Sequence, residues 1–302
     1  MIGHVIAGRY EIVRQLGAGG MGAVYQARQL SMDRMVALKI IHPHLVSEEV
    51  ARRFHREMKA TSKIEHPNTI RVFDFGADEN GQLFLAMEFL EGRPLSRVLD
   101  DEGALPLRRI VHIASQVLRA LGAAHAEGIA HRDLKPDNIM LVDRYGDTDV
   151  VKVLDFGIAR FVDGDESRNK MTHDGAVVGT PAYMSPEQAL GHAVDYRADF
   201  YSLGVMLYQM ALGRLPFDGP SLAALLVAHA TEPPPLPSVI APGKVAPALE
   251  ALIVRLLAKA PAARPTTAAE VLQALEACSD TPSSAPPTAN ASAAPSANAS
   301  AN

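Results

Sequence analysis

The chain has 302 residues, of which 48% are hydrophobic and 21% charged, so its length and composition fit one large globular domain or two smaller ones. A net charge of -5 without a dominant basic block argues against a nucleic-acid-binding protein that depends on phosphate contacts. The single cysteine excludes an intrachain disulfide and fits a reducing, intracellular setting, and residues 1–10 lack the apolar core of a signal peptide.

The first distinctive feature is a glycine-rich loop between two predicted strands, residues 9–16 and 23–27. The loop has the sequence Gly-Ala-Gly-Gly-Met-Gly at residues 17–22. Bare backbone N–H groups in such a loop can approach a phosphate closely. A dinucleotide-binding fold requires the loop to open a helix, and a P-loop ends in Gly-Lys-Ser/Thr, and neither pattern is present. A phosphate-binding loop and a plain glycine hairpin both remain open at this point.

A lysine and a glutamate stand out in the next two elements. Residues 35–41 predict a third strand that contains Lys39, and residues 47–64 predict a helix whose first turn suits its positive N-terminal end. Glu57 falls on the largely apolar face of this helix. An unpaired buried carboxylate costs several kcal/mol, so Glu57 needs a partner, and Lys39 is the obvious candidate. The alternative is that Glu57 lies at the edge of the face, in water.

The character of the chain changes near residues 88–92. Before this point, residues 70–75 and 83–89 predict two further strands. After it, the long apolar runs at residues 107–126 and 199–212 predict helices. The sequence therefore predicts a strand-rich first part and a helix-rich second part.

The most informative stretch is His-Arg-Asp-Leu-Lys-Pro-Asp-Asn at residues 131–138, which precedes an apolar run. In a loop, the carboxylate of Asp133 and the amide of Asn138 can point into one pocket. The sequence Asp-Phe-Gly follows at residues 155–157, again after an apolar run. In order and spacing, these two motifs resemble the catalytic loop and the metal-binding turn of a protein kinase.

A long polar segment joins Asp155 to Glu187. A segment of this length without periodicity is usually a functional loop or a disordered one. It ends in Gly-Thr-Pro-Ala-Tyr-Met-Ser-Pro-Glu at residues 179–187, which resembles the end of a kinase activation segment. Ser185 stands where the family often has alanine, and we expect little from that difference.

Taken together, residues 10–277 resemble the eukaryotic-like serine/threonine protein kinases, most closely their bacterial members. The resemblance implies an α+β, bilobal protein-kinase fold with a β-rich N-lobe and a mostly helical C-lobe, over residues 1–278. The expected parts are an N-lobe at about 1–87, a hinge at about 88–92 and a C-lobe at about 93–278. Residues 279–302 are rich in Ala, Ser, Pro and Asn, which predicts a disordered tail or linker.

The resemblance also implies the chemistry, which is transfer of the ATP γ-phosphate to Ser/Thr hydroxyls of proteins in bacterial signalling. Asp133 would orient the acceptor hydroxyl, Lys135 would neutralise γ-phosphate charge, and Thr180 would shape the site around the acceptor. Asn138 and Asp155 would hold Mg²⁺, with Mn²⁺ as the alternative metal.

The nucleotide would lie under the glycine-rich loop, with its phosphates near Lys39, which Glu57 would hold in place. Its adenine would meet the hinge. The residues expected to contact ATP lie in the loop, the strands beside it and the hinge: Leu16, Gly17, Ala18, Gly19, Gly20, Met21, Gly22, Val24, Ala37, Lys39, Met87, Glu88 and Leu90.

Three residues are candidates for regulation. Arg132, beside the expected catalytic aspartate, would be left partly unpaired unless an anion joins it, and a phosphate on the activation segment would supply that anion. Thr172 is the first candidate for this phosphate. Asp174 occupies a position where related bacterial kinases often carry a second threonine, and we hypothesise that it supplies part of the negative charge.

Three further residues have expected structural roles. The resemblance implies an ion pair between Glu187 and Arg264. It also implies that Asp199 braces the catalytic loop from below, whereas the residue pattern alone allows Asp199 to be a simple N-cap.

Two other functions are weighed against a protein kinase. A pseudokinase scaffold would lack a chemical group, but Lys39, Glu57, Asp133, Asn138 and Asp155 are all present. A small-molecule phosphotransferase of the antibiotic or choline kinase type would lack this form of activation segment. The expected partners are protein substrates, and self-association for autophosphorylation is a further expectation, with no nucleic acid.

The expected location is cytoplasmic, with a membrane tether if the gene continues past residue 302. The longest uncharged apolar stretch, about residues 200–213, is too short to span a bilayer and fits a buried helix better.

Overall fold

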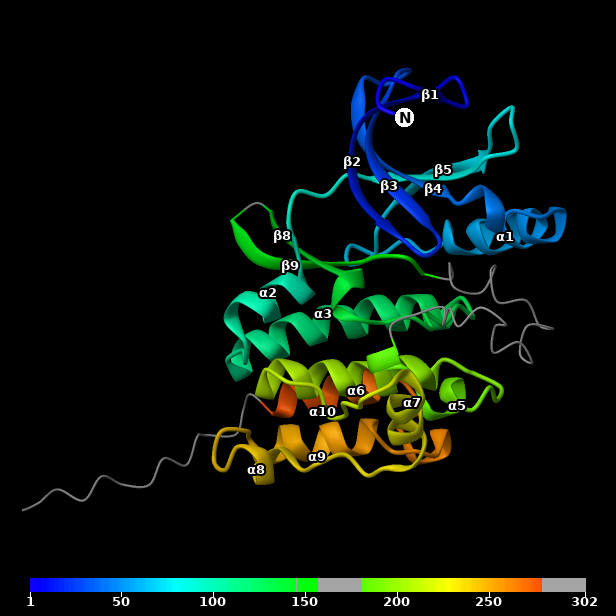
Figure 1. The fold of residues 1–302 in the computed structure, drawn as a ribbon. Coiled ribbons are helices and arrows are strands. Elements are labelled where there is room, and N and C mark those ends of the chain that lie inside the picture. The colour runs from blue at the N-terminus through cyan, green and yellow to red at the C-terminus, as the bar shows by residue number, and fades with distance from the viewer. Residues whose placement is uncertain (145, 157–180, 279–302) are drawn as a thin grey trace, which may run out of the picture.

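The computed structural model describes residues 1–144, 146–156 and 181–278, which form a sheet-rich lobe and a helical lobe (Figure 1). The first lobe is one antiparallel sheet in the order β1-β2-β3-β4-β6-β5. Its strands are β1 (Val5–Ile6), β2 (Tyr10–Gly19), β3 (Gly22–Gln29), β4 (Arg34–Ile41), β5 (Val72–Ala77) and β6 (Leu83–Glu88). This lobe confirms the β-rich N-terminal half that the sequence predicts.

Helix α1 (Glu48–Thr61) packs against the sheet of the first lobe. Its N-cap is Ser47, whose hydroxyl accepts a hydrogen bond from the Val50 N–H at 3.2 Å. Phe54, Glu57 and Met58 form its buried face. Glu57 is only 8% exposed, so it faces inward and the alternative that it lies in water is wrong.

The glycine-rich segment is a hairpin rather than a helix start. Strand β2 continues to Gly19, which pairs with Gly22, and only Gly20 and Met21 form the turn. The predicted first strand was therefore too short, because the small residues 17–19 keep extended backbone and pair with β3.

The close approach of β3 to β4 requires a glycine at position 22. A side-chain carbon on Gly22 would collide with the carbonyl oxygen of Ile40, whereas one on Gly20 would meet no atom within 4 Å. We expect Gly22→Ala to lower the free energy of unfolding by about 1–3 kcal/mol, the usual cost of overpacking. Denaturant unfolding measures this, with Gly20→Ala as the control that leaves the midpoint nearly unchanged. Equal midpoints for the two variants would contradict the prediction.

The second lobe is built around two long helices, α3 (Leu107–Ala126) and α6 (Arg197–Leu212). The second lobe also has a three-stranded sheet of β7 (Arg93–Pro94), β8 (Ile139–Arg144) and β9 (Asp147–Val153). This sheet lies at the end of the second lobe that faces the first lobe (Figure 1). Among the described residues the lobe also has α2 (Leu95–Glu102), α5 (Pro186–Ala189), α7 (Leu222–Thr231), α8 (Pro237–Ile240), α9 (Pro247–Leu256) and α10 (Ala268–Ala277). In the part of the chain that the structure describes, short 3₁₀ turns are η1 (Pro43–Leu45), η2 (Pro136–Asn138), η4 (Pro181–Tyr183) and η5 (Pro261–Ala263).

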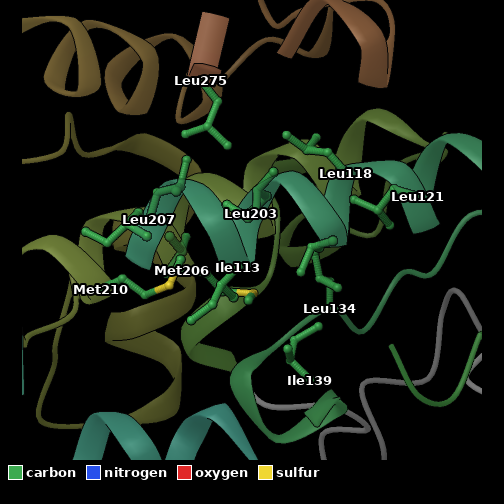
Figure 2. Close-up of a cluster of buried hydrophobic side chains, with 14 of the residues drawn as sticks. Ile113, Leu118, Leu121, Leu134, Ile139, Leu203, Met206, Leu207, Met210 and Leu275 are labelled. Carbon is green, nitrogen blue, oxygen red and sulfur yellow. The ribbon is translucent and has the colours of Figure 1, made fainter. Parts of the chain in front are cut away.

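The core of the second lobe anchors residues 131–138 (Figure 2). Side chains of α3, α6 and α10 meet in one apolar cluster, and Leu134 and Ile139 belong to it. Both residues are almost fully buried. Burial of two apolar side chains around a polar stretch holds that stretch in place, at about 1.5–3 kcal/mol per side chain.

The two lobes are joined along β9. The Val153 N–H donates to the Asn68 carbonyl at 2.8 Å, and the Ile70 N–H donates to the Val153 carbonyl at 2.9 Å. The ammonium of Lys152 donates to the Glu88 carboxylate at 2.7 Å and to the Thr69 carbonyl at 3.2 Å. The strand that leads to Asp155 is therefore attached to both the hinge region and the loop after α1.

Membrane insertion has no candidate helix in this fold. In the stretches 1–144, 146–156 and 181–278, none of the helices combines the length and the apolar character that a bilayer crossing needs.

Candidate active site

Residues 131–138 form a loop between α3 and β8 that ends in the 3₁₀ turn η2. The ring of His131 is fully buried and lies 2.7 Å from the Leu154 carbonyl oxygen through its Nε2. The same ring packs against Phe156, with a centroid separation of 4.8 Å. His131 therefore connects this loop to the turn that carries Asp155.

The hairpin of β8 and β9 brings Asn138 and Asp155 together. Ile139 pairs with Val153, so the residues on either side of this pair are neighbours, and the Leu154 N–H donates to the Asn138 carbonyl at 2.8 Å. The side-chain amide of Asn138 donates to the Asp133 carbonyl at 2.7 Å and to the Asp133 carboxylate at 3.3 Å. The two carboxylates and the amide that the sequence singled out thus lie in one site.

The donor atoms of this site fit a divalent metal ion. The amide nitrogen of Asn138 is used by Asp133, so its Oδ1 is left as a ligand. Asp155 uses Oδ2 for an ion pair, which leaves its Oδ1. Amide and carboxylate oxygens are the hard ligands that Mg²⁺ and Mn²⁺ take, usually together with phosphate oxygens of the substrate.

Lys39 reaches across from the sheet of the first lobe to Asp155. Its ammonium lies 2.6 Å from Asp155 Oδ2, and the side chains are 10% and 26% exposed. Asp155 has a φ of +59°, a left-handed conformation that is costly for a residue other than glycine and is kept where the surroundings impose it. Glu57 forms an ion pair with Arg56 at 3.3 Å, and its predicted pair with Lys39 stays a prediction.

Asp133 forms an ion pair with Lys135 of the same loop. The Lys135 ammonium lies 3.0 Å from Asp133 Oδ2, and both side chains are partly exposed. The arrangement leaves a carboxylate and an ammonium open to a ligand on one side of the loop.

The expected nucleotide-binding residues divide into two groups. Those of the glycine hairpin lie on β2, β3 and the turn between them. Ala37 pairs directly with Met87 in the sheet, and both side chains are buried. Leu90 follows β6 and is half-buried.

The carboxylate of Glu88 is engaged with cations away from the glycine hairpin. Burial opposes its ionisation, but hydrogen bonds from Lys152, from the Arg71 N–H and from Arg144 outweigh burial and lower the pKa of Glu88. Only the backbone of Glu88 is therefore left to meet a ligand.

Asp199 lies beneath the loop and holds its backbone. It is fully buried, and its carboxylate accepts hydrogen bonds from the His131 N–H at 2.8 Å and the Arg132 N–H at 2.7 Å. His125, which sequence reasoning missed, contacts the same carboxylate at 2.8 Å. Helix α6 has Tyr196 as its N-cap, so the simple N-cap interpretation of Asp199 is wrong.

Glu187 and Arg264 form the buried ion pair that the resemblance implies. Two parallel hydrogen bonds of 2.7 Å join the guanidinium to the carboxylate. Arg264 also donates to the backbone carbonyls of Ala258, Lys259 and Arg197, so its charge is well satisfied. The pair fixes the segment after Pro181 to the base of the second lobe.

A buried histidine near this pair makes stability depend on pH. Burial, and then the nearby Lys259 charge, lower the pKa of His229 to about 4, and its Nδ1 lies 3.0 Å from the Tyr201 hydroxyl oxygen. Between pH about 6.5 and about 4 the unfolded chain binds a proton that the folded chain does not, so the free energy of unfolding should fall as pH falls through this window.

The expected size of this pH effect is on the order of 3 kcal/mol across the window. Chemical denaturation at several pH values measures it. The variant His229→Gln should show a weaker pH dependence, and an unchanged dependence would contradict the assignment to His229.

The regulatory predictions are only partly described by the structure. Thr172 and Asp174 lie outside the described residues, and so does Thr180, which was predicted to shape the site around the acceptor. Arg132 is described: its guanidinium donates to the Val194 carbonyl at 3.3 Å, and its φ of +66° is again a left-handed conformation.

Comparison with known proteins places this geometry in context. The model of the protein kinase domain matches residues 10–275. The serine/threonine-protein kinase pkn3 of Myxococcus xanthus is 48% identical over 269 residues, which cover 88% of this chain and 49% of the relative. The serine/threonine-protein kinase PksC of Streptomyces coelicolor is 43% identical over 268 residues, 86% of this chain and 47% of the relative. The chain thus spans about half the length of these relatives.

A solved structure gives the same result for the fold. The crystal structure of the Mycobacterium tuberculosis PknI kinase domain is similar, with a TM-score of 0.70 and 30% sequence identity, over 92% of this chain and 98% of that one.

Proposed function

This chain belongs to the protein kinase domain family, and from that premise we propose that it transfers the γ-phosphate of ATP to serine or threonine hydroxyls of proteins. One observation carries the proposal. Asp133, Asn138 and the Lys39–Asp155 ion pair lie in one site, and Lys39 pairs with Val24 of the strand that follows the glycine turn. The activity is proposed for residues 1–278, with the lobe boundaries at about residues 87 and 93.

The residues of the site have separate tasks in this reaction. Asp133 accepts a hydrogen bond from the acceptor hydroxyl and takes its proton as the oxygen attacks the γ-phosphorus, and ADP leaves. Lys135, 3.0 Å from Asp133, neutralises charge on the transferring phosphoryl group. Lys39 holds the α/β-phosphates.

Asn138 and Asp155 would hold the metal, which when bound neutralises phosphate charge. The protein family uses ATP with a divalent cation, and we propose Mg²⁺, with Mn²⁺ able to replace it. Chelation by EDTA should abolish transfer, and each metal added back alone tests this choice.

The test is incubation of the purified chain with γ-labelled ATP and acceptor proteins, followed by phosphoamino-acid analysis. Labelled phosphoserine or phosphothreonine supports the proposal. Nucleotide binding without transfer would instead indicate a scaffold, and label found only on small molecules would indicate a small-molecule phosphotransferase. EDTA is the control for metal dependence.

Regulation through the activation segment is a further part of the proposal. We propose that the chain self-associates and phosphorylates Thr172, that this phosphate joins Arg132, and that Asp174 supplies part of the charge. Phosphopeptide mapping after incubation with ATP tests it. Fully active enzyme that is unmodified at Thr172 would overturn it.

A further inference from the structure

Gln188, in the first turn of α5, contacts the backbone beside Asp133. Its amide nitrogen donates a hydrogen bond to the Arg132 carbonyl oxygen at 2.7 Å. Gln188 ends the Ser-Pro-Glu-Gln sequence that resembles bacterial members of the family, but neither the motif spacing nor the resemblance gave it a role. It follows Glu187 directly, so the segment fixed by Arg264 also reaches the catalytic loop.

The amide of Gln188 is itself held in one orientation. Its Oε1 accepts hydrogen bonds from the Ser185 N–H and the Ser185 hydroxyl, both at 3.0 Å, and Ser185 caps α5 in return as a capping box. If the side-chain amide of Gln188 were flipped, its Oε1 would face the Arg132 carbonyl oxygen, and two acceptors cannot form a hydrogen bond. Ser185 is fully buried in this network. That serine in place of alanine matters little stays a prediction, which the variant Ser185→Ala tests.

The Arg132 residue needs such support because its φ is +66°. A left-handed conformation costs on the order of 1–3 kcal/mol for a residue other than glycine. Asp199 holds the N–H of Arg132 from one side at 2.7 Å, and Gln188 holds the C=O from the other.

The hydrogen bond from Gln188 also fixes the orientation of the peptide group that precedes Asp133. A peptide group is planar, so fixing the Arg132 carbonyl fixes the Asp133 N–H in the opposite direction, where it lies 3.3 Å from His131 Nδ1. The same plane contains the Cα atom of Asp133, so the point from which its side chain extends is fixed as well.

We infer that Gln188 is a positioning residue, which orients the peptide group between Arg132 and Asp133 for phosphoryl transfer. The inference rests on the proposed function. It also means that the catalytic loop is held by α5 through Gln188 as well as by α6 through Asp199.

Two substitutions of Gln188 and one matched control test the inference. Gln188→Glu keeps an acceptor for Ser185 but cannot donate as a carboxylate, and Gln188→Met keeps the length without either function. Ser185→Ala removes the cap hydroxyl and leaves the Gln188 donor in place. For both Gln188 variants we expect kcat to fall by about 10- to 100-fold, since small misplacements of a reacting group have effects of this order.

The other measurements separate positioning from loss of structure. The KM for ATP should stay within about twofold, because Lys39, Asp155 and the glycine hairpin are untouched, and Ser185→Ala should lose less than about threefold in kcat. Thermal melts report folding, and if Gln188→Glu does not fold, Gln188→Met carries the comparison.

Each outcome decides one claim. Wild-type chain without transfer overturns the proposed function. Active wild type with unchanged kcat in the Gln188 variants overturns the inference alone. A kcat loss of equal size in Ser185→Ala would assign the effect to the cap and would also overturn it.

Discussion

Replacing Asp133 with asparagine should lower kcat by roughly 10²–10⁴-fold while ATP binding is retained. Asp133 is the carboxylate placed to take the hydroxyl proton, and asparagine has no basic oxygen for it. Asp133 contacts Lys135 and Asn138, whereas Lys39 pairs with Asp155, so the groups expected to hold the nucleotide keep their contacts. Steady-state kinetics give kcat, and fluorescence titration with a nucleotide analogue gives the dissociation constant.

A neighbouring carboxylate serves as the matched control. Asp137 lies in the same loop but is exposed, and Asp137→Asn should keep kcat near the wild-type value. If Asp133→Asn retained nearly full activity, Asp133 would lose the role assigned to it.

The second large effect is on stability, through the buried ion pair at the base of the second lobe. Arg264→Ala should lower the free energy of unfolding by about 3–5 kcal/mol, because it leaves the Glu187 carboxylate buried without its counter-charge. The expected loss comes from removing one partner, not from the net value of the pair. Urea unfolding measures the change, and the slope of the transition shows whether unfolding stays cooperative.

An exposed ion pair provides the comparison. Arg93 pairs with Asp101 at 2.6 Å, with both side chains 52% exposed, and Arg93→Ala should change stability by less than about 1 kcal/mol. If the two variants lost similar amounts of unfolding free energy, burial would not be what makes loss of the Glu187–Arg264 pair costly.

Much of the fold could be predicted from local patterns. The apolar run at residues 107–126 coincides with α3, because twenty residues of helical periodicity leave little choice of element. Other predicted boundaries differ from the observed ones, because contacts with other elements determine where a strand or helix ends. Strand β2 runs on to Gly19 because β3 is there to pair with it, and α6 begins at Arg197 rather than at Asp199.

The candidate site shows the same division. The family resemblance predicted that Asn138 and Asp155 lie together, and the short hairpin of β8 and β9 is what brings them together in the structure. The ion pair between Lys39 and Asp155 could not be predicted in the same way. Glu57 and Asp155 are both far from it in sequence, and only the placement of the second lobe against the sheet brings Asp155 within 2.6 Å. Gln188 was missed because its contact is with a backbone carbonyl, which no side-chain pattern encodes.

The attachment of Lys152 has a mechanical consequence. Lys152 binds the Glu88 carboxylate and the Thr69 carbonyl, and Asp155 lies three residues further along the chain, just after β9 ends at Val153. A rotation of the sheet lobe, such as one that admits a nucleotide, must either break these contacts of Lys152 or move β9 together with the lobe. Asp155 would then move together with the sheet lobe. Entry of a nucleotide and the readiness of Asp155 to bind the metal would therefore be coupled.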